Sequence, residues 1–202
     1  AIGRVNQPEG VGHCSGALVK ADWILTAAHC VYSLSEHRWL RPDEIVFVAD
    51  LRRDEDSGFS RGKKIIKNSD YEPNGSSVNI SQDWALIQLE RTFEIQPIRI
   101  LDISSPSAVT KTNAKLMTAG YPKERPYLLD LDPDCQITDF SFDRQVMITN
   151  CDSTQGDSGA PLLLKTANSY FIVGVFSAAT MANSVDPHTF AVSASQFDAK
   201  IP

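Results

Sequence analysis

The sequence lacks any long apolar segment and any concentration of basic charge. No apolar run in its 202 residues approaches the roughly 18 to 20 that a membrane-spanning helix requires. The net charge is -6, whereas proteins that bind nucleic acids usually present clustered Lys and Arg to the phosphates. We therefore expect no membrane span and no nucleic-acid partner.

A targeting segment is also lacking at the start. The first residues, Ala1-Ile2-Gly3-Arg4, have no basic region, apolar region and cleavage site in the order of a signal peptide. If the protein is exported, we expect this sequence to be its mature form. The hydrophobic content of 42% and the charged content of 22% are typical of a folded globular protein.

Cysteine is scarce, and its spacing excludes the commonest metal and redox motifs. Four cysteines at positions 14, 30, 135 and 151 form no C-x-x-C pair, so disulfides are the better interpretation. Four cysteines allow three pairings, and the local pairs Cys14–Cys30 and Cys135–Cys151 would each close a loop of similar size. Either bridge would add about 3 kcal/mol of stability and indicates a secreted or periplasmic protein.

Helical periodicity is nearly absent, apart from a turn after residues 27–29 and a short C-terminal stretch at 195–201. Short apolar or alternating runs recur instead between turn residues, which favours an all-β sandwich or barrel. These runs are 16–19, 23–26, 45–48, 64–66, 84–89, 116–119, 145–149, 161–164, 171–176 and 189–192. A segment rich in Ser, Pro and Thr at 100–112 indicates a connector between two β domains, 1–103 and 104–202.

An acidic and basic run at 51–61 has two interpretations. A solvated hairpin tip is the simpler one, whereas clustered carboxylates at 52–58 would also suit a calcium ion. We keep calcium open there and otherwise expect no metal and no cofactor.

The strongest chemical signal is Gly156-Asp157-Ser158-Gly159, a serine flanked by glycines between two strands. Glycines allow a tight turn whose amide N–H groups point outward, as the stabilisation of an oxyanion requires. A serine alone is a weak nucleophile and needs a base, which in turn needs a partner that fixes its tautomer.

A base and an acid are available in the first half of the chain. His29 follows the apolar run 23–26 and precedes Cys30, which can anchor it. Asp83 heads the apolar run 84–89, where a carboxylate is expected to be buried and to need a partner such as an imidazole N–H. Taken singly, each fragment could also be structural.

Together, in the order histidine, aspartate, serine, these fragments resemble the chymotrypsin-like serine proteases. The resemblance covers nearly the whole chain, through the segments 14–19, 26–30, 83–89 and 152–161. It implies two perpendicular six-stranded antiparallel β-barrels with the catalytic cleft between them and a short C-terminal helix. It also implies a serine endopeptidase that acts on protein or peptide substrates, and we expect it to be monomeric.

The resemblance assigns roles residue by residue. Ser158 would attack the scissile carbonyl, His29 would transfer the proton and Asp83 would hold the imidazole. The amides of Gly156 and Ser158 would form the oxyanion hole. Ser177 matches the serine that hydrogen-bonds the catalytic aspartate. Cys14–Cys30 matches the disulfide of the histidine loop, which leaves Cys135–Cys151 as the second pair.

The resemblance also points to the specificity pocket, though with departures. Asp152, six residues before Ser158, would form the floor and favour Arg or Lys. His188 stands near a position where trypsin-like enzymes keep a glycine, and would instead favour Glu or Asp, or small residues, if it lies in the pocket. The expected substrate-binding residues are Asp152, Ser153, Gln155, Ser177, Ala178, Ala179 and His188.

Asp157 is the second departure. Trypsin-like enzymes pair this aspartate with a freed terminal ammonium, but here Ile2 lies only 12 residues before Cys14. Either Arg144, Arg125 or another cation replaces the ammonium, or residues before Ala1 have been lost.

Two other functions stay open at this stage. One is an inactive protease-like binding or regulatory module, which the retention of all three catalytic residues disfavours. The other is an esterase with the same machinery, although an α/β-hydrolase would need alternating helices and strands.

Overall fold

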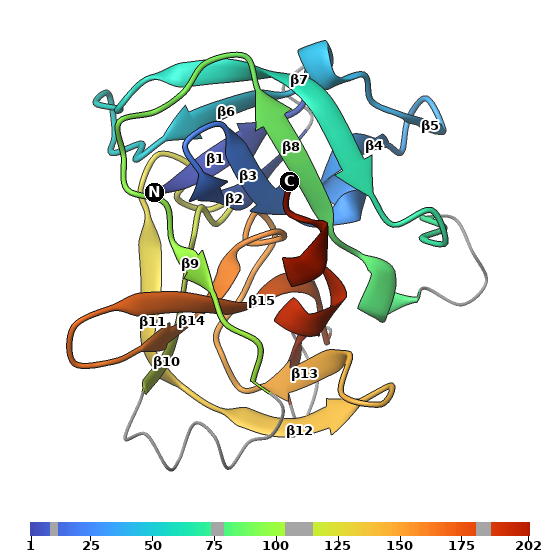
Figure 1. Cartoon of the computed structure of the whole chain (residues 1–202), viewed down its shortest axis with the longest axis vertical. Coiled ribbons are helices and arrows are strands. Elements are labelled where there is room, and N and C mark those ends of the chain that lie inside the picture. The colour runs from blue at the N-terminus through green and yellow to red at the C-terminus, as the bar shows by residue number, and fades with distance from the viewer. Residues whose placement is uncertain (9–11, 74–78, 104–114, 181–186) are drawn as a thin grey trace.

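The computed structural model describes residues 1–8, 12–73, 79–103, 115–180 and 187–202. Strands dominate it, and short 3-10 helices join them (Figure 1). Each of the ten apolar runs expected as a strand coincides with a strand or lies inside a longer one, to within one residue at its ends. The all-β class is confirmed.

The first half of the chain forms a closed antiparallel barrel. Its strands follow the order β1 (Ile2–Asn6), β2 (His13–Lys20), β3 (Trp23–Thr26), β8 (Ala85–Leu89), β7 (Phe59–Lys67) and β6 (Val46–Ala49), which pairs back with β1. Side chains alternate across the wall: Phe47 and Ala49 are fully buried, whereas Val46 and Val48 on the same strand are half-buried. Closure leaves the sheet of this barrel without a free edge among its described strands.

The second half departs from the expected closed barrel. Its pairing order is β11 (Asp130–Cys135), β10 (Lys115–Gly120), β14 (Pro161–Lys165), β15 (Tyr170–Ala179), β16 (Thr189–Ser193), β13 (Val146–Thr149) and β12 (Ile137–Ser141), and β9 (Arg99–Ile100) joins β15 in parallel. Among the described residues no ladder joins β11 to β12, so this sheet is a half-barrel rather than a closed barrel. The two end strands are polar and partly exposed, and β11 contains Pro133, which suits a sheet edge.

Short elements complete the first half. They are the 3-10 helices η2 (Ala28–Val31), η3 (Pro42–Glu44) and η4 (Ile80–Gln82) and the two-stranded pair β4 (Tyr32–Ser33) and β5 (Arg38–Trp39). The expected C-terminal helix is present as two 3-10 helices, η5 (Ala194–Gln196) and η6 (Asp198–Lys200). Between them Phe197 is fully buried and packs on Trp84, with 6.3 Å between the ring centres.

A continuous apolar cluster joins the two halves. It combines residues of the first barrel, such as Leu25 and Trp84, with residues of the second sheet, such as Tyr121 and Val175. Figure 1 shows the C-terminal segment, in red, returning to the first barrel beside β8. Apolar area removed from water stabilises a folded protein by about 25 cal/mol per Å². The burial of this shared cluster therefore holds the two halves together.

Two local disulfides brace the chain. Cys14 on β2 is bonded to Cys30 in η2, and Cys135 at the end of β11 is bonded to Cys151 after β13. The first bridge ties the turn that carries His29 to the barrel wall.

The connector expected at 100–112 lies mostly outside the described residues. Before it, β9 already pairs with β15 of the second sheet, so the chain joins that sheet by residue 99. The boundary at 103/104 stays a prediction. Within the described ranges, no helix has the length and apolar character needed to span a membrane.

Candidate active site

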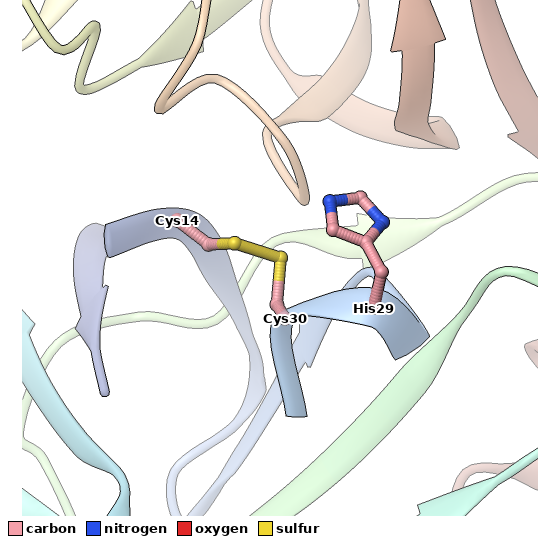
Figure 2. A group of neighbouring side chains, drawn as sticks. All are labelled: Cys14, His29 and Cys30. Carbon is pink, nitrogen blue, oxygen red and sulfur yellow. A yellow bond between two sulfur atoms is a disulfide. The ribbon is translucent and has the colours of Figure 1, made fainter. Parts of the chain in front are cut away.

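His29 and Asp83 are brought together by two short helices at one end of the first barrel. His29 lies in η2, directly after β3, and Asp83 ends η4, directly before β8. Because β3 and β8 are neighbours in the barrel, their ends place the two side chains side by side. Figure 2 shows the imidazole of His29 and the disulfide of Cys30 projecting from neighbouring positions of this turn.

Asp83 is a buried carboxylate that accepts several hydrogen bonds. One oxygen accepts the backbone N–H of His29 at 2.9 Å. The other lies 2.7 Å from Nδ1 of His29 and accepts the hydroxyl of Ser177 at 2.6 Å. The side chain of Asp83 is only 2% exposed, and an ionised carboxylate can only accept hydrogen bonds. Nδ1 of His29 therefore carries a proton, which leaves the lone pair on Nε2.

The same contacts set the ionisation of the pair. Burial alone would raise the pKa of Asp83, but the neighbouring imidazole and the hydrogen bonds outweigh it and lower the pKa. Burial likewise would lower the pKa of His29, but the charge of Asp83 and its hydrogen bond raise it above 6.5. Tyr71, which is also buried, has its pKa raised by burial and then by the negative charge of Asp83. Asp83 is thus a fixed negative charge behind a titratable base.

Ser158 lies in a turn that packs against the turn of His29. The carbonyl oxygen of Ser158 accepts the N–H of Ser15 at 2.8 Å and lies 3.7 Å from Sγ of Cys30. Gly159 has a φ of +79°, and a Cβ there would collide with Thr26. This close approach packs the turn of Ser158 against the chain segment that leads from β3 into η2. Among the described residues the Ser158 hydroxyl has no hydrogen-bond partner, and such catalytic contacts often tighten only with substrate bound.

The turn also presents two free amides. Gly156 has a φ of +101°, and its carbonyl accepts the hydroxyl of Ser15 at 2.9 Å. That hydroxyl in turn accepts the N–H of Tyr121 at 2.8 Å. Within the described part of the chain, the N–H groups of Gly156 and Ser158 donate no hydrogen bond. Two backbone donors beside a serine can stabilise an oxyanion.

Asp157 lies between these amides in an acidic setting. One carboxylate oxygen accepts the N–H of Thr154 at 2.9 Å, and the side chain lines a cavity of about 230 Å³. Burial, followed by the charges of Asp130, Asp152 and Glu124, raises its pKa to about 6.

The cations considered for Asp157 each contact another group. Arg125 lines the same cavity but forms its ion pair with Asp130, at 2.6 Å. The guanidinium of Arg144 stacks on Phe140, 5.9 Å from the ring centre. The amino group of Ala1 lies 2.8 Å from Asp50.

A separate pocket of about 470 Å³ adjoins Ser158. Its described lining residues are Glu124, Ser153, Thr154, Gln155, Ser158, Phe176, Ser177, Ala178, Ala179 and Thr180. Five of the seven expected substrate-binding residues are therefore in it, and Asp152 and His188 are not. Asp152 is exposed, lines the cavity beside Asp157 and donates its N–H to Asp132 at 2.8 Å. The backbone of His188 pairs with Thr180, through an N–H to Oγ1 contact of 2.9 Å.

The expected substrate-binding residues do not include four others that, besides Ser158, line this pocket, namely Glu124, Thr154, Phe176 and Thr180. Glu124 belongs to a loop after β10 that reaches the pocket through contacts with residues 154 and 155. No regular spacing links such a loop to Ser158, so the sequence carries no signal for it beyond the charge itself.

No metal centre is apparent from the described residues. The two groups with metal-ligand spacing both contain disulfide-bonded cysteines, whose sulfurs are not thiolates. The loop considered for calcium is a tight turn in which Gly58 donates its N–H to the carboxylate of Asp56 at 2.7 Å. Calcium binding there stays untested.

The fold and the site define a two-unit β protein of the chymotrypsin-like kind, in which an aspartate–histidine pair belongs to the first unit and the turn of a glycine-bounded serine packs against that unit. Comparisons with known proteins agree. The family model described as "Trypsin" matches residues 4–201. The chain therefore belongs to the trypsin family.

Its relatives are distant. Trypsin-2 of Salmo salar is 28% identical over 178 residues, which cover 79% of this chain and 72% of the relative. Trypsin II-P29 of Gallus gallus is 27% identical and covers 79% and 68%. A solved structure of a Glu endopeptidase matches with a TM-score of 0.73 at 18% identity, over 95% of this chain and 84% of that chain. At this identity the structural match shows the fold alone.

Proposed function

We propose that this protein is a serine endopeptidase that hydrolyses peptide bonds through an acyl-enzyme on Ser158. The observation that carries the proposal is the buried carboxylate of Asp83, 2.7 Å from Nδ1 of His29, at the point where the turn of Ser158 packs. This arrangement leaves a basic Nε2 in a site that also offers two free amides. Each of these features alone is common, but together they suit acyl transfer.

The first half-reaction acylates the enzyme. The hydroxyl oxygen of Ser158 attacks the carbonyl carbon while its proton passes to Nε2 of His29. The amides of Gly156 and Ser158 hold the oxyanion, and the C–N bond breaks as the imidazolium returns its proton to the leaving amine. Asp83 stays ionised throughout and stabilises the imidazolium.

The second half-reaction reverses these roles with water. His29 accepts a proton from a water molecule, whose oxygen attacks the ester carbonyl. The tetrahedral intermediate then collapses, the acid product leaves, and the proton returns to the oxygen of Ser158. No cofactor enters either step.

Cavities on both sides of the site support cleavage within a chain. The pocket of about 470 Å³ adjoins Ser158, and a second one of about 410 Å³ adjoins His29 next to β4 and β5. A substrate can therefore extend in both directions from the scissile bond. In addition, β14 pairs with β15 as far as Val175, and Phe176 still bonds to the backbone of residues 159 and 160, so the edge that β15 offers to an extended peptide begins after Phe176.

The working environment follows from the cysteines. All four form disulfides, which persist in oxidising compartments. We therefore infer that the protein acts outside the cytosol, either secreted or in a periplasm.

A fluorophosphonate probe tests the proposal. We expect the wild-type protein to be labelled on Ser158 and the Ser158→Ala variant to be unlabelled. Ser195→Ala, an exposed serine outside the described cavities, is the matched control and should still be labelled. A mixture of peptides should then be cleaved at internal bonds by the wild-type protein. Absence of labelling and of cleavage would refute an active serine endopeptidase.

A further inference from the structure

The hydroxyl of Ser15, on β2, links three segments that are far apart in the sequence. It donates to the carbonyl of Gly156 at 2.9 Å and accepts the N–H of Tyr121 at 2.8 Å. Ser15 is fully buried, so both hydrogen bonds are shielded from water. Resting on the proposed function, we propose that Ser15 is a positioning residue for the reaction, whose hydroxyl fixes the direction in which the amides of Gly156 and Ser158 point at the oxyanion.

The orientation of the two amides follows from the carbonyls that share their peptide planes. In a planar trans peptide the C=O and N–H groups point in opposite directions, so a hydrogen bond to one carbonyl also sets the direction of the next N–H. The carbonyl of Gln155 accepts the N–H of Lys123 at 2.6 Å, which sets the N–H of Gly156. The carbonyl of Asp157 accepts an amide N–H within the turn at 2.8 Å, which sets the N–H of Ser158.

Ser15 fixes the peptide plane that lies between these two. The carbonyl of Gly156 belongs to the peptide that joins Gly156 to Asp157, and it accepts the hydroxyl of Ser15. At the other end of the same peptide, the N–H of Asp157 donates to the carbonyl of Thr154 at 3.1 Å. The three successive carbonyls of residues 155–157 are therefore all anchored. Of these three anchors only the middle one is a side chain, so a substitution removes it without changing the backbone.

The same hydroxyl also supports the first anchor. By accepting the N–H of Tyr121, it holds the loop after β10 in which Lys123 lies two residues further on. His13, also on β2, supports this loop through Nε2, which lies 2.8 Å from the carbonyl oxygen of Tyr121. A carbonyl only accepts hydrogen bonds, so Nε2 is the donor. The loop that anchors Gln155 is thus tied to the first barrel at both the N–H and the C=O of one residue.

The packing around these hydrogen bonds is tight. The backbone of Ser15 is itself held, because its N–H donates to the carbonyl of Ser158 and its carbonyl accepts the hydroxyl of Thr26, both at 2.8 Å. An added Cβ at Gly156 would collide with the carbonyl oxygen of Tyr121. Loss of the hydroxyl would therefore leave a buried N–H and a buried C=O without their partner, and a rotation of the turn would relieve this cost.

The test measures kcat and KM for one peptide substrate in the wild-type protein, Ser15→Ala and Ser60→Ala. Ser60 is the matched control, because its buried hydroxyl likewise donates to a carbonyl, that of Arg61 at 3.0 Å, and accepts an N–H, that of Arg91 at 3.2 Å. It lies on β7 and lines neither cavity that adjoins Ser158 or His29.

We expect Ser15→Ala to lower kcat about 10²-fold, the loss that a displacement of about 1 Å in a site can cause, and to change KM by less than about threefold. The reason is that the amides meet the oxyanion only in the transition state, so their direction affects kcat more than substrate binding. Ser60→Ala should keep both values within about twofold, as expected of a change remote from the site.

Two further measurements separate positioning from other causes of lost activity. The hydroxyl of Ser15 bonds to neither His29 nor Asp83, so the pH midpoint of kcat should be the same in Ser15→Ala as in the wild type. A peptide aldehyde adds to Ser158 as a hemiacetal whose oxygen takes the place of the oxyanion, and its inhibition should weaken about as much as kcat falls. Inhibition by the corresponding peptide alcohol, which forms no adduct, should not change.

A pair of isosteric variants isolates the hydroxyl at constant volume. Ser15→Thr keeps the hydroxyl, whereas Ser15→Val has a methyl group in its place, so a packing change common to both cancels in their ratio. We expect kcat of Ser15→Thr to exceed that of Ser15→Val by about tenfold or more. Urea denaturation shows which variants are folded, and the pair tests the inference even where Ser15→Ala does not fold.

Four results would overturn the inference. They are a folded Ser15→Ala with the kcat of Ser60→Ala, equal kcat values in Ser15→Thr and Ser15→Val, equal weakening of the aldehyde and the alcohol, and a shifted pH midpoint. If the wild type reacts with the fluorophosphonate while one of these is found, only the role of Ser15 is wrong. If the wild type is not labelled and cleaves no peptide, the proposed function fails and the role of Ser15 fails with it.

Discussion

Asp83 and Asp157 are two aspartates of one active-site region, yet their surroundings have opposite effects. Asp83 accepts hydrogen bonds from His29 and Ser177, is buried and has a lowered pKa. Asp157 receives one hydrogen bond from a neighbouring amide, faces other carboxylates and has a pKa raised to about 6. Both are buried to some degree, so burial alone does not decide the charge of a carboxylate. The donors and the neighbouring charges decide it.

The difference extends to the two halves of the protein. In the closed barrel, each carboxylate oxygen of Asp83 accepts a hydrogen bond, which fixes the orientation of the side chain. In the half-barrel, the carboxylates around residues 124, 152 and 157 lie in loops and along the walls of two cavities. The base and its carboxylate therefore belong to the first half, whereas Ser158 and the carboxylate-lined cavities belong to loops of the second half.

The comparison is tested most strongly by replacing each aspartate with asparagine. Asp83→Asn removes the charge that fixes the tautomer of His29, and we expect kcat to fall by about 10⁴-fold. Asp157→Asn keeps the acceptor for Thr154, so its effect on kcat should be far smaller. Steady-state cleavage of one peptide by both variants measures the two kcat values. Similar losses of kcat in the two variants would contradict the proposed difference between Asp83 and Asp157.

The next largest expected effect is a loss of stability when the contact between Gly159 and Thr26 is disturbed. Gly159→Ala adds a methyl group that would collide with Thr26 at a positive φ, so we expect a loss of about 2–3 kcal/mol in the free energy of unfolding. Gly12→Ala is the control, because nothing lies within 4 Å of its added Cβ. Urea denaturation of both variants measures this. A stability equal to that of the wild type in Gly159→Ala would contradict the tight packing of the two turns.

The smallest effect concerns the pH dependence of stability. The pKa of Asp157 is about 6 in the folded protein against an ordinary value of 3.8, so the folded state binds this proton more tightly than the unfolded chain. Its contribution to stability is full below pH 3.8 and is lost as the pH rises through 6. Asp157→Asn should therefore be more stable than the wild type by about 1–2 kcal/mol at pH 8, after allowance for solvent screening, and no more stable at pH 4. Denaturation at the two pH values checks this, and an equal difference at both would contradict it.

The sequence predicts the fold unevenly. Apolar runs such as 161–164 and 171–176 are confirmed as parts of the strands β14 and β15. Most of their side chains are buried, so the apolar sequence itself indicates the strand. The strands β1 and β11 were not predicted. The first contains Gly3 and Arg4, and the second is largely acidic, so both owe their structure to pairing with a neighbour.

The site is predicted unevenly for a similar reason. His29, Asp83 and Ser158 were named from motifs beside apolar strands, and the structure brings their turns together. The position of Glu124, by contrast, results from hydrogen bonds between two loops, which leave no periodic pattern in the sequence. The same loops carry Asp152 into a different cavity from the one that adjoins Ser158.

The activation of Ser158 by His29 is tested most directly by the rate at which a fluorophosphonate labels the protein as a function of pH. The charge of Asp83 raises the pKa of His29 against the effect of burial, and only the neutral imidazole can accept the proton of Ser158. The labelling rate should therefore fall as the pH drops through a value above 6.5, and His29→Ala should lose both the rate and its pH dependence. Labelling of Ser158 at the wild-type rate in His29→Ala would contradict the proposed mechanism.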